Sequence, residues 1–365
     1  MKVVASRLLV FLFLMFTFSA SIAQNTEAET AEKGVTKEEV DEVIEHHMAD
    51  DYYYTFLSNK ETGAHYGFPL PVILIDNGLK IFSASEFDYG ENVVNKGGQY
   101  YKLYHSKIYK TDAQGTIQYK ENGFPANERP LDFSITKNVV NILIVGVIMF
   151  LLFTGMAKSY RRSVVPKGLT GILEPIVLYV KDEIAIPNIG EKHYKRFMPY
   201  LLTIFFFIWI VNMLGMTPLG MNVTGNIAVT FALAIITFVI TQVVGTKTYW
   251  SHIFDPLGSS MPWIAKIPLY ILLVPIEILG IFIKPFSLMI RLFANMSAGH
   301  IVMMSLLGMI FIFKSWVGGP LTFGLTVFIM IIEFFVALLQ AYVFTILSAL
   351  YFGFAVAEHE TEEAQ

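Results

Sequence analysis

One arginine stands in the middle of an apolar stretch that is long enough to cross a lipid bilayer. Residues 284–302, KPFSLMIRLFANMSAGHIV, have a helical pattern with Pro285 in the first turn, and Arg291 lies near the centre. Arginine keeps its charge, and a charge at the bilayer centre costs from ~2.5 to more than 10 kcal/mol, so Arg291 requires a carboxylate or water. A functional arginine is favoured here over a structural ion pair.

The composition independently indicates a membrane protein. Hydrophobic residues make up 54% of the 365 residues and charged residues only 15%, whereas soluble domains carry about 25% charged residues. The net charge of -4 argues against nucleic acid as a partner. The chain has no cysteine, which excludes disulfides, thiol catalysis and cysteine-ligated metals.

The first 23 residues have the pattern of a secretory signal peptide. Lys2 and Arg7 precede an apolar run, and Ser21 to Ala23 supply small residues at the cleavage position. We expect this segment to be cleaved after Ala23, which implies a protein of the bacterial cell envelope. The alternative is that the segment is retained as a membrane anchor.

Residues 24–135 are polar by comparison and are expected outside the cytoplasm. Residues 24–50 are acidic and either helix-prone or disordered. From about residue 66, short apolar pieces alternate with Asn-Gly and Gly-Gly turns, which predicts a small β-rich region. Four histidines in this part show no ligand spacing, so no metal or other cofactor is expected: His46, His47, His65 and His105.

The rest of the chain, residues 136–357, is predicted to be an all-α polytopic membrane domain with about five crossing helices and a cytoplasmic tail at 358–365. The expected helices are 138–157, 197–216, 226–246, 285–313 and 320–356, with amphipathic interfacial segments at 168–196 and 268–283. The last two helices exceed the ~30 Å of hydrocarbon and must tilt strongly. Four basic residues after the first helix place that end in the cytoplasm: Lys158, Arg161, Arg162 and Lys167.

Several polar residues lie inside these apolar segments. Ser287, Arg291 and Asn295 follow at i, i+4 and i+8 and form one stripe, whereas His300 lies about 180° from Arg291 and ~13 Å further along. On the last helix Glu333 and Gln340 are seven residues apart and nearly share a face. A wet proton path through Glu333 and His300 is favoured over a static pair between them. Asn141 and Asn212 either line water or bond a neighbouring helix.

Two motifs resemble subunit a of F-type ATP synthases, the stationary half of the proton turbine. R-L-F-A-N-M-x-A-G-H at 291–300 is similar to the family's signature helix, and E-F-F-V-A-L-L-Q-A-Y-V-F at 333–344 is similar to its last helix. The long extension before residue 136 is not covered by the resemblance. Family members often carry a polar or acidic residue after the equivalent of Pro218, where this chain has Leu219 and Gly220.

The resemblance implies a non-catalytic subunit of the Fo proton channel in the bacterial inner membrane. Protons would enter past Gln340, Glu333 and His300, with Asn295 on the entry side, and reach a carboxylate on the ring of c subunits. They would leave near Glu277, although a simple interfacial pair of Glu277 with Lys284 is the alternative. Arg291 would separate the two half-channels, with Ser287 in its stripe. The implied partners are the c ring, the b-type peripheral stalk, the bilayer and, indirectly, the F1 catalytic sector, with H⁺ as the default ion.

A secondary transporter and a membrane-embedded hydrolase are the alternatives to a proton-channel subunit. A secondary transporter could use an intramembrane arginine to bind an anionic substrate, but no convincing internal repeat is present. A membrane-embedded hydrolase lacks an H-E-x-x-H or G-x-S-x-G pattern, and no G-x-x-x-x-G-K-[ST] loop for nucleotide is present. Any ATP chemistry would therefore belong to partners.

Overall fold

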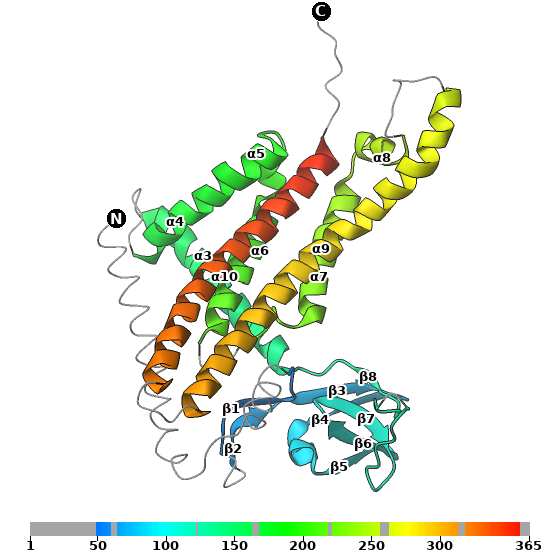
Figure 1. Cartoon of the computed structure of the whole chain (residues 1–365), viewed down its shortest axis with the longest axis vertical. Helices are drawn as coiled ribbons and strands as arrows, with labels where there is room; N and C mark the ends of the chain where they lie inside the picture. The colour runs from blue at the N-terminus through cyan, green and yellow to red at the C-terminus, as the bar shows by residue number, and fades with distance from the viewer. Residues whose placement is uncertain are drawn as a thin grey trace, which may run out of the picture. The chain divides into compact units, whose positions relative to one another are not determined.

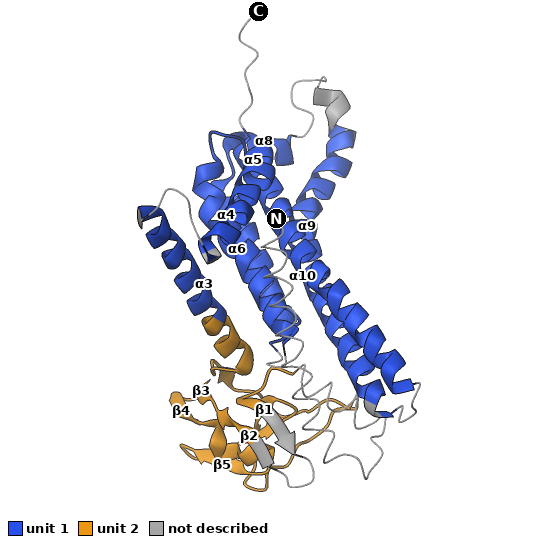
Figure 2. Cartoon of the chain, turned by 90° about the vertical axis from the view of Figure 1, so that its left-hand side faces the viewer, with its two compact units in different colours: residues 1–41, 145–365 blue, residues 42–144 orange. Residues whose placement is uncertain are grey.

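The chain divides into a helical unit, which contains most of the membrane-length helices and which we call the membrane unit, and a β-rich unit (Figure 2). The structure, a computed structural model, describes residues 49–59, 64–121, 123–162, 168–217, 221–255, 263–312 and 318–357. One unit comprises residues 1–41 and 145–365, and the other residues 42–144. The expected signal peptide, the tail at 358–365, His46, His47 and residues 218–220 lie outside the described residues.

Five helices are long and apolar enough to cross a membrane: Lys137–Arg161, Tyr194–Gly215, Ile227–Val244, Leu269–Ile310 and Gly318–Val356. They belong to the helices α3 (Lys137–Arg162), α6 (Tyr194–Gly215), α7 (Ile227–Val244), α9 (Trp263–Ile312) and α10 (Gly318–Val356). Shorter pieces are α4 (Leu169–Tyr179), the π-helical η2 (Val180–Ala185), α5 (Ile186–Ile189) and α8 (Lys247–Phe254). The predicted fold class, a polytopic helical membrane protein with a β-rich N-terminal region, is confirmed.

The helix α10 is the centre of the membrane unit. It packs against α6, α7 and α9 and also touches α5 and η2. Figure 1 shows α9 and α10 running side by side over much of their length. With 50 and 39 residues they measure about 75 Å and 58 Å at ~1.5 Å per residue. Both are therefore much longer than the ~30 Å hydrocarbon layer.

The predicted separation of an interfacial segment 268–283 from a helix starting at Pro285 is wrong. The helix α9 is continuous through Pro268, Pro275 and Pro285, so Pro285 lies in its interior rather than in its first turn. A proline removes one backbone hydrogen bond but keeps a helical φ, and neighbouring helices make this tolerable in membrane helices.

The β-rich unit contains three small antiparallel sheets. Their strands are β1 (Tyr53–Asn59), β2 (Ala64–Pro69), β3 (Pro71–Ile75), β4 (Leu79–Ser83), β5 (Val93–Lys96), β6 (Gln99–Tyr104), β7 (Lys107–Thr111) and β8 (Leu131–Asp132). The orders are β1-β2, β4-β3-β8 and β5-β6-β7, with a 3₁₀ segment η1 (Ala84–Gly90) after β4. Strand structure begins at Tyr53 and not at about residue 66, because β1 is stabilised by pairing with β2.

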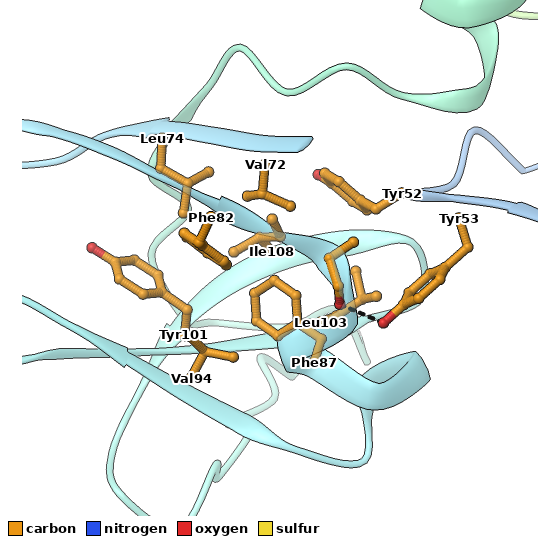
Figure 3. Close-up of a cluster of buried hydrophobic side chains, with 11 residues drawn as sticks. Tyr52, Tyr53, Val72, Leu74, Phe82, Phe87, Val94, Tyr101, Leu103 and Ile108 are labelled. Carbon is orange, nitrogen blue, oxygen red and sulfur yellow. Dashed lines mark hydrogen bonds between the residues drawn. The ribbon is translucent and has the colours of Figure 1, made fainter. Parts of the chain in front are cut away.

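The core of this unit lies between the β4-β3-β8 and β5-β6-β7 sheets. Alternate residues of β3, Val72 and Leu74, point inward, and Phe87 of η1 fills the middle. Figure 3 shows these side chains between the two layers, with the Tyr53 hydroxyl bonded to the Ala84 carbonyl. The cluster consists of Tyr52, Tyr53, Val72, Leu74, Phe82, Ala84, Phe87, Val94, Tyr101, Leu103 and Ile108.

The start of α3 is bound to the β-rich unit, to which its first turns belong. The Asp50 carboxylate accepts hydrogen bonds from the Thr136 hydroxyl and the Asn138 amide, both at 3.0 Å. The Lys137 amide donates to the Asp51 carbonyl at 2.9 Å. A carboxylate at a helix N-terminus satisfies free amides and interacts favourably with the helix dipole, so Asp50 fixes where α3 begins.

One carboxylate joins three elements at the edge of the core. Asp76 accepts hydrogen bonds from the Tyr101 hydroxyl at 2.7 Å and from the Lys110 ammonium at 2.9 Å. The bonds from Lys110 and Tyr101 lower the pKa of Asp76 below its usual value. Burial and the adjacent Asp76 carboxylate raise the pKa of Tyr101.

Replacing Asp76 with asparagine is expected to destabilise the β-rich unit by about 1 kcal/mol at neutral pH, because one charge-assisted bond is lost. The lowered pKa contributes stability that is present above the unfolded pKa of about 3.9 and is lost as the pH falls through the folded pKa. The difference between wild type and Asp76→Asn should therefore shrink in acid. Hydrogen exchange of the strand amides, measured on the full chain from pH 7 to below pH 4, checks this.

Glu91→Gln is the matched control, because Glu91 is an exposed carboxylate of the same unit. It should behave like wild type at every pH. An Asp76→Asn difference that persists unchanged in acid would mean that the carboxylate charge contributes nothing.

Candidate functional site

The polar stripe of α9 lies on a surface that the chain leaves open. Ser287, Arg291 and Asn295 are exposed, whereas Leu288, Leu292 and Met296 on the packed side of the helix are buried. Among the described residues no carboxylate forms an ion pair with Arg291. A guanidinium cannot face hydrocarbon without a large penalty, so this open surface requires a partner carboxylate or water.

Asn295 connects this stripe to the last helix. Its side-chain amide donates to the Gln340 carbonyl oxygen at 2.9 Å, and Gln340 is buried. The bond orients the Gln340 amide toward α9. The two residues from the separate motifs therefore meet.

Glu333 of α10 packs against a glycine of α9. A Cβ atom added to Gly299 would lie 2.4 Å from the Glu333 carboxyl group, so only glycine leaves room for the carboxyl in this place. Gly299 directly precedes His300. The structure therefore brings the Glu333 carboxyl next to the residue adjacent to His300.

His300 is buried and points toward α6. A Cβ atom on Gly215, at the end of α6, would lie 3.1 Å from His300 Nε2 and 2.9 Å from the Met221 carbonyl oxygen. His300 is only 4% exposed. It therefore lies on the packed side of α9, away from the open surface of Arg291, as the helical spacing predicts.

A group of polar residues near His300 was only partly foreseen. The Thr224 hydroxyl donates to Asn212 Oδ1 at 2.6 Å, and the Ser297 hydroxyl donates to the Gly225 carbonyl at 3.4 Å. Asn222 is also buried in the same loop, and its amide has no hydrogen-bond partner in the described part of the chain. We call Asn212, Asn222, Thr224, Ser297 and His300 the polar cluster. Its loop members carry no periodic signal, although polar residues in an uncharged loop between two spans could have pointed to them.

Asn141 and Asn212, for which the sequence allowed either contact with water or a bond to a neighbouring element, both form hydrogen bonds with protein groups. Asn212 accepts from Thr224, as above, and Asn141 accepts a hydrogen bond from the Tyr54 hydroxyl at 2.9 Å. Asn141 thus helps to attach α3 to β1. The side-chain nitrogen of Asn212, Nδ2, has no partner among the described residues, which leaves a donor for water.

Glu277 and Lys284 lie on the N-terminal side of Arg291 in α9. Lys284 Nζ lies 5.8 Å from the ring centre of Tyr351 and 5.9 Å from that of Phe354, within cation–π range. In the described residues Lys284 forms no ion pair with Glu277. The alternative interfacial pair is therefore absent, and Lys284 is held against α10.

A cavity of about 20 Å³ lies beside Lys284, which is room for roughly one water molecule. Its polar lining comes from four helices, α7 to α10: Thr237, Thr241, Gln242, Tyr249, Lys284 and Tyr351. Polar side chains therefore lie on both sides of Arg291 along α9, near Lys284 and near His300. Within the described ranges no group of three acidic or histidine side chains is placed to hold a metal.

Comparisons with known proteins assign both parts of the chain. A family model described as ATP synthase A chain matches residues 139–353, more than half of the chain. A second model, a domain of unknown function named DUF8433, matches residues 43–133 and so falls within the β-rich unit.

Similar proteins agree with the first match. The ATP synthase subunit a of Chloroherpeton thalassium is 42% identical over 63% of this chain and 68% of its own length. ATP synthase subunit a 2 of Chlorobaculum tepidum is 44% identical over 64% of this chain and 66% of its own length. The subunit of Myxococcus xanthus is 45% identical over 62% and 74%. The alignments thus span about two thirds of these relatives, and the chain belongs to the ATP synthase subunit a family.

Proposed function

We propose that this chain is the stationary proton-conducting subunit of an ATP synthase and provides two offset half-channels to a ring of c subunits. The carrying observation is that Arg291 is exposed on a membrane-length helix without a carboxylate partner in the described chain. A rotating carboxylate from another subunit supplies the missing counter-charge. The chain itself carries no catalytic site in this proposal, and ATP chemistry belongs to the F1 sector.

The entry half-channel runs along the packed side of α9. It contains Gln340, Glu333, His300 and the other residues of the polar cluster. The Asn295–Gln340 bond links this path to the open face of Arg291. Partnerless amide atoms of Asn212 and Asn222 favour water in this region, because buried polar groups are ordinarily hydrogen-bonded.

The exit half-channel lies toward the other end of α9. Glu277 precedes Arg291 by fourteen residues, which is about 21 Å along a helix. The small cavity at Lys284 and Tyr351, whose lining includes polar groups from four helices, has room for about one water molecule on this side. Ser287 lies between the exit side and Arg291 on the same stripe.

Arg291 separates the two paths. As a permanent cation it favours the ionised form of a c-ring carboxylate, which must lose its proton before it can pass. Arginine is not deprotonated at ordinary pH, so it does not relay protons between the half-channels. A lysine at this position could deprotonate when desolvated and would separate the paths poorly.

Charge placement gives the orientation. Basic residues in the last turns of α3, namely Lys158, Arg161 and Arg162, assign that end to the cytoplasm. The β-rich unit and the loop between α6 and α7 then face outside, and the C-terminus is cytoplasmic. The expected setting is a bacterial inner membrane, with the c ring and a b-type stalk as partners and H⁺ as the ion.

The direct test is ATP-driven acidification of inverted vesicles that contain the assembled enzyme. Arg291→Ala should abolish proton pumping and proton-driven ATP synthesis, because the two half-channels are no longer separated and the rotor carboxylate loses its counter-charge. ATP hydrolysis by the detached catalytic sector should be unchanged. Subunit levels are matched by immunoblot.

Arg196→Ala is the control, because it removes an exposed arginine at the start of α6. It should pump like wild type. Pumping that persists in Arg291→Ala would make the arginine structural and would favour a transporter instead.

Gly299→Ala tests whether the position of the Glu333 carboxyl matters. The added Cβ displaces only the flexible end of Glu333, so thermal stability should stay within about 1 kcal/mol of wild type. Proton pumping should fall several-fold, because the carboxyl moves out of the entry path. Vesicle acidification and thermal unfolding in detergent, measured on the same preparations, separate the two effects.

Gly280→Ala is the matched control on the same helix, because a Cβ there has open space within 4 Å. It should leave pumping and stability unchanged. Normal pumping by Gly299→Ala would exclude a positional role of Glu333 in proton entry.

A further inference from the structure

The β4-β3-β8 sheet is apolar on both faces. Its inner face, with Val72, Leu74 and Phe82, is buried in the core. Its outer face also carries large apolar side chains, which are 64% to 66% exposed at four positions: Leu79, Ile81, Leu131 and Phe133. An antiparallel sheet with one free face ordinarily shows polar residues on it, so this face is built to be covered.

Strand register makes the outer face continuous. Ile75 pairs directly with both Leu79 and Leu131, and Ile73 pairs with Ile81. The Phe133 amide donates to the Ile73 carbonyl, which extends the pairing beyond β8. We call Ile73, Ile75, Leu79, Ile81, Leu131 and Phe133 the outer apolar face. The outward positions of these three strands carry no charged residue.

This face lies close to the point where the chain enters the bilayer. Phe133 precedes Lys137, the first residue of α3, by four residues, which span at most ~14 Å. The intervening chain stays on the sheet, because the Ile135 amide donates to the Pro71 carbonyl at 3.1 Å. In Figures 1 and 2 the β3 and β4 layer lies between β5 and the first turns of α3.

The first turns of α3 belong to the same unit and also carry exposed apolar side chains. Val139 and Leu143 are exposed on the helix, within the segment that is apolar enough to span a membrane. The bonds of Asp50 and Asp51 to the start of α3 attach the segment before β1, in the same unit, to this helix. Aromatic and aliphatic side chains beside a membrane entry point are typical of groups that insert at the headgroup boundary.

We propose that the outer apolar face binds the lipid bilayer surface around α3, so that the β-rich unit is seated in the headgroup region rather than suspended in water. Its occupant is phospholipid, at the boundary between headgroups and acyl chains. The β5-β6-β7 sheet, on the other side of the core, faces water. This inference requires only that α3 crosses the membrane and is independent of proton conduction.

The absence of cysteine from the chain gives a clean test, because a single introduced cysteine takes a nitroxide label without background. Ile81→Cys and Leu131→Cys place the label on the outer apolar face, and Lys107→Cys places it at an exposed position of β7 as the control. The full-length variants are reconstituted into phospholipid nanodiscs. Collision rates with oxygen, which partitions into lipid, and with a water-soluble nickel chelate are then measured by electron paramagnetic resonance.

Labels at Ile81 and Leu131 should collide with oxygen several-fold more, relative to the nickel chelate, than the label at Lys107. Equal ratios at all three positions would overturn the proposal, because the face would then be in water. Protection of Ile81 and Leu131 from both reagents would also overturn it, because protein would then cover the face, either another part of this chain or a second molecule. Both failures leave the outcome at Arg291 unaffected.

Discussion

The permanent charge of Arg291 imposes the main physical constraint on the membrane unit. A guanidinium in a helix long enough to span the bilayer needs a polar environment. The two sides of α9 differ in this respect. Its open side exposes Arg291 in line with Ser287 and Asn295, while its packed side buries leucines, methionine and His300. One helix thus exposes a cation that no carboxylate of the described residues pairs with, and keeps its histidine buried within the protein.

Close backbone approach allows polar side chains to pack between the helices. Glycine at position 299 admits the Glu333 carboxyl, and glycine at position 215 admits the His300 ring. Small residues at helix contacts are the usual means of bringing membrane helices together, since no hydrophobic effect drives association in lipid. Here the space left by glycine is filled by groups that can carry protons.

The sequence predicted well what depends on composition and periodicity, and poorly what depends on tertiary contacts. Long apolar runs predicted five spans, including the two that contain Arg291 or Glu333, because lipid demands about 20 mostly apolar residues and satisfied backbone bonds. The local rule for proline wrongly broke α9 at Pro285, because it ignores neighbouring helices. The strand β1 was missed because its partner β2 is what makes it a strand. Helical spacing correctly predicted that His300 lies opposite Arg291. The hydrogen bond from the loop residue Thr224 to Asn212 is visible only in the structure, because a loop has no periodicity that predicts its contacts.

The start of α3 belongs to the β-rich unit and is also the start of a helix that is long enough to cross a membrane. Asp50 attaches the start of α3 by accepting hydrogen bonds from the Asn138 amide, which would otherwise have no partner in the first turn, and from the Thr136 hydroxyl. A helix start fixed in this way also fixes the depth of α3, because the charged and polar groups around Lys137 cannot follow it into hydrocarbon. A sheet with an apolar outer face, attached at that depth, buries its exposed side chains in lipid only if it stays near the surface. Anchoring of the helix and the proposed seating of the sheet would therefore support each other, and each would restrict rotation of α3 about its axis.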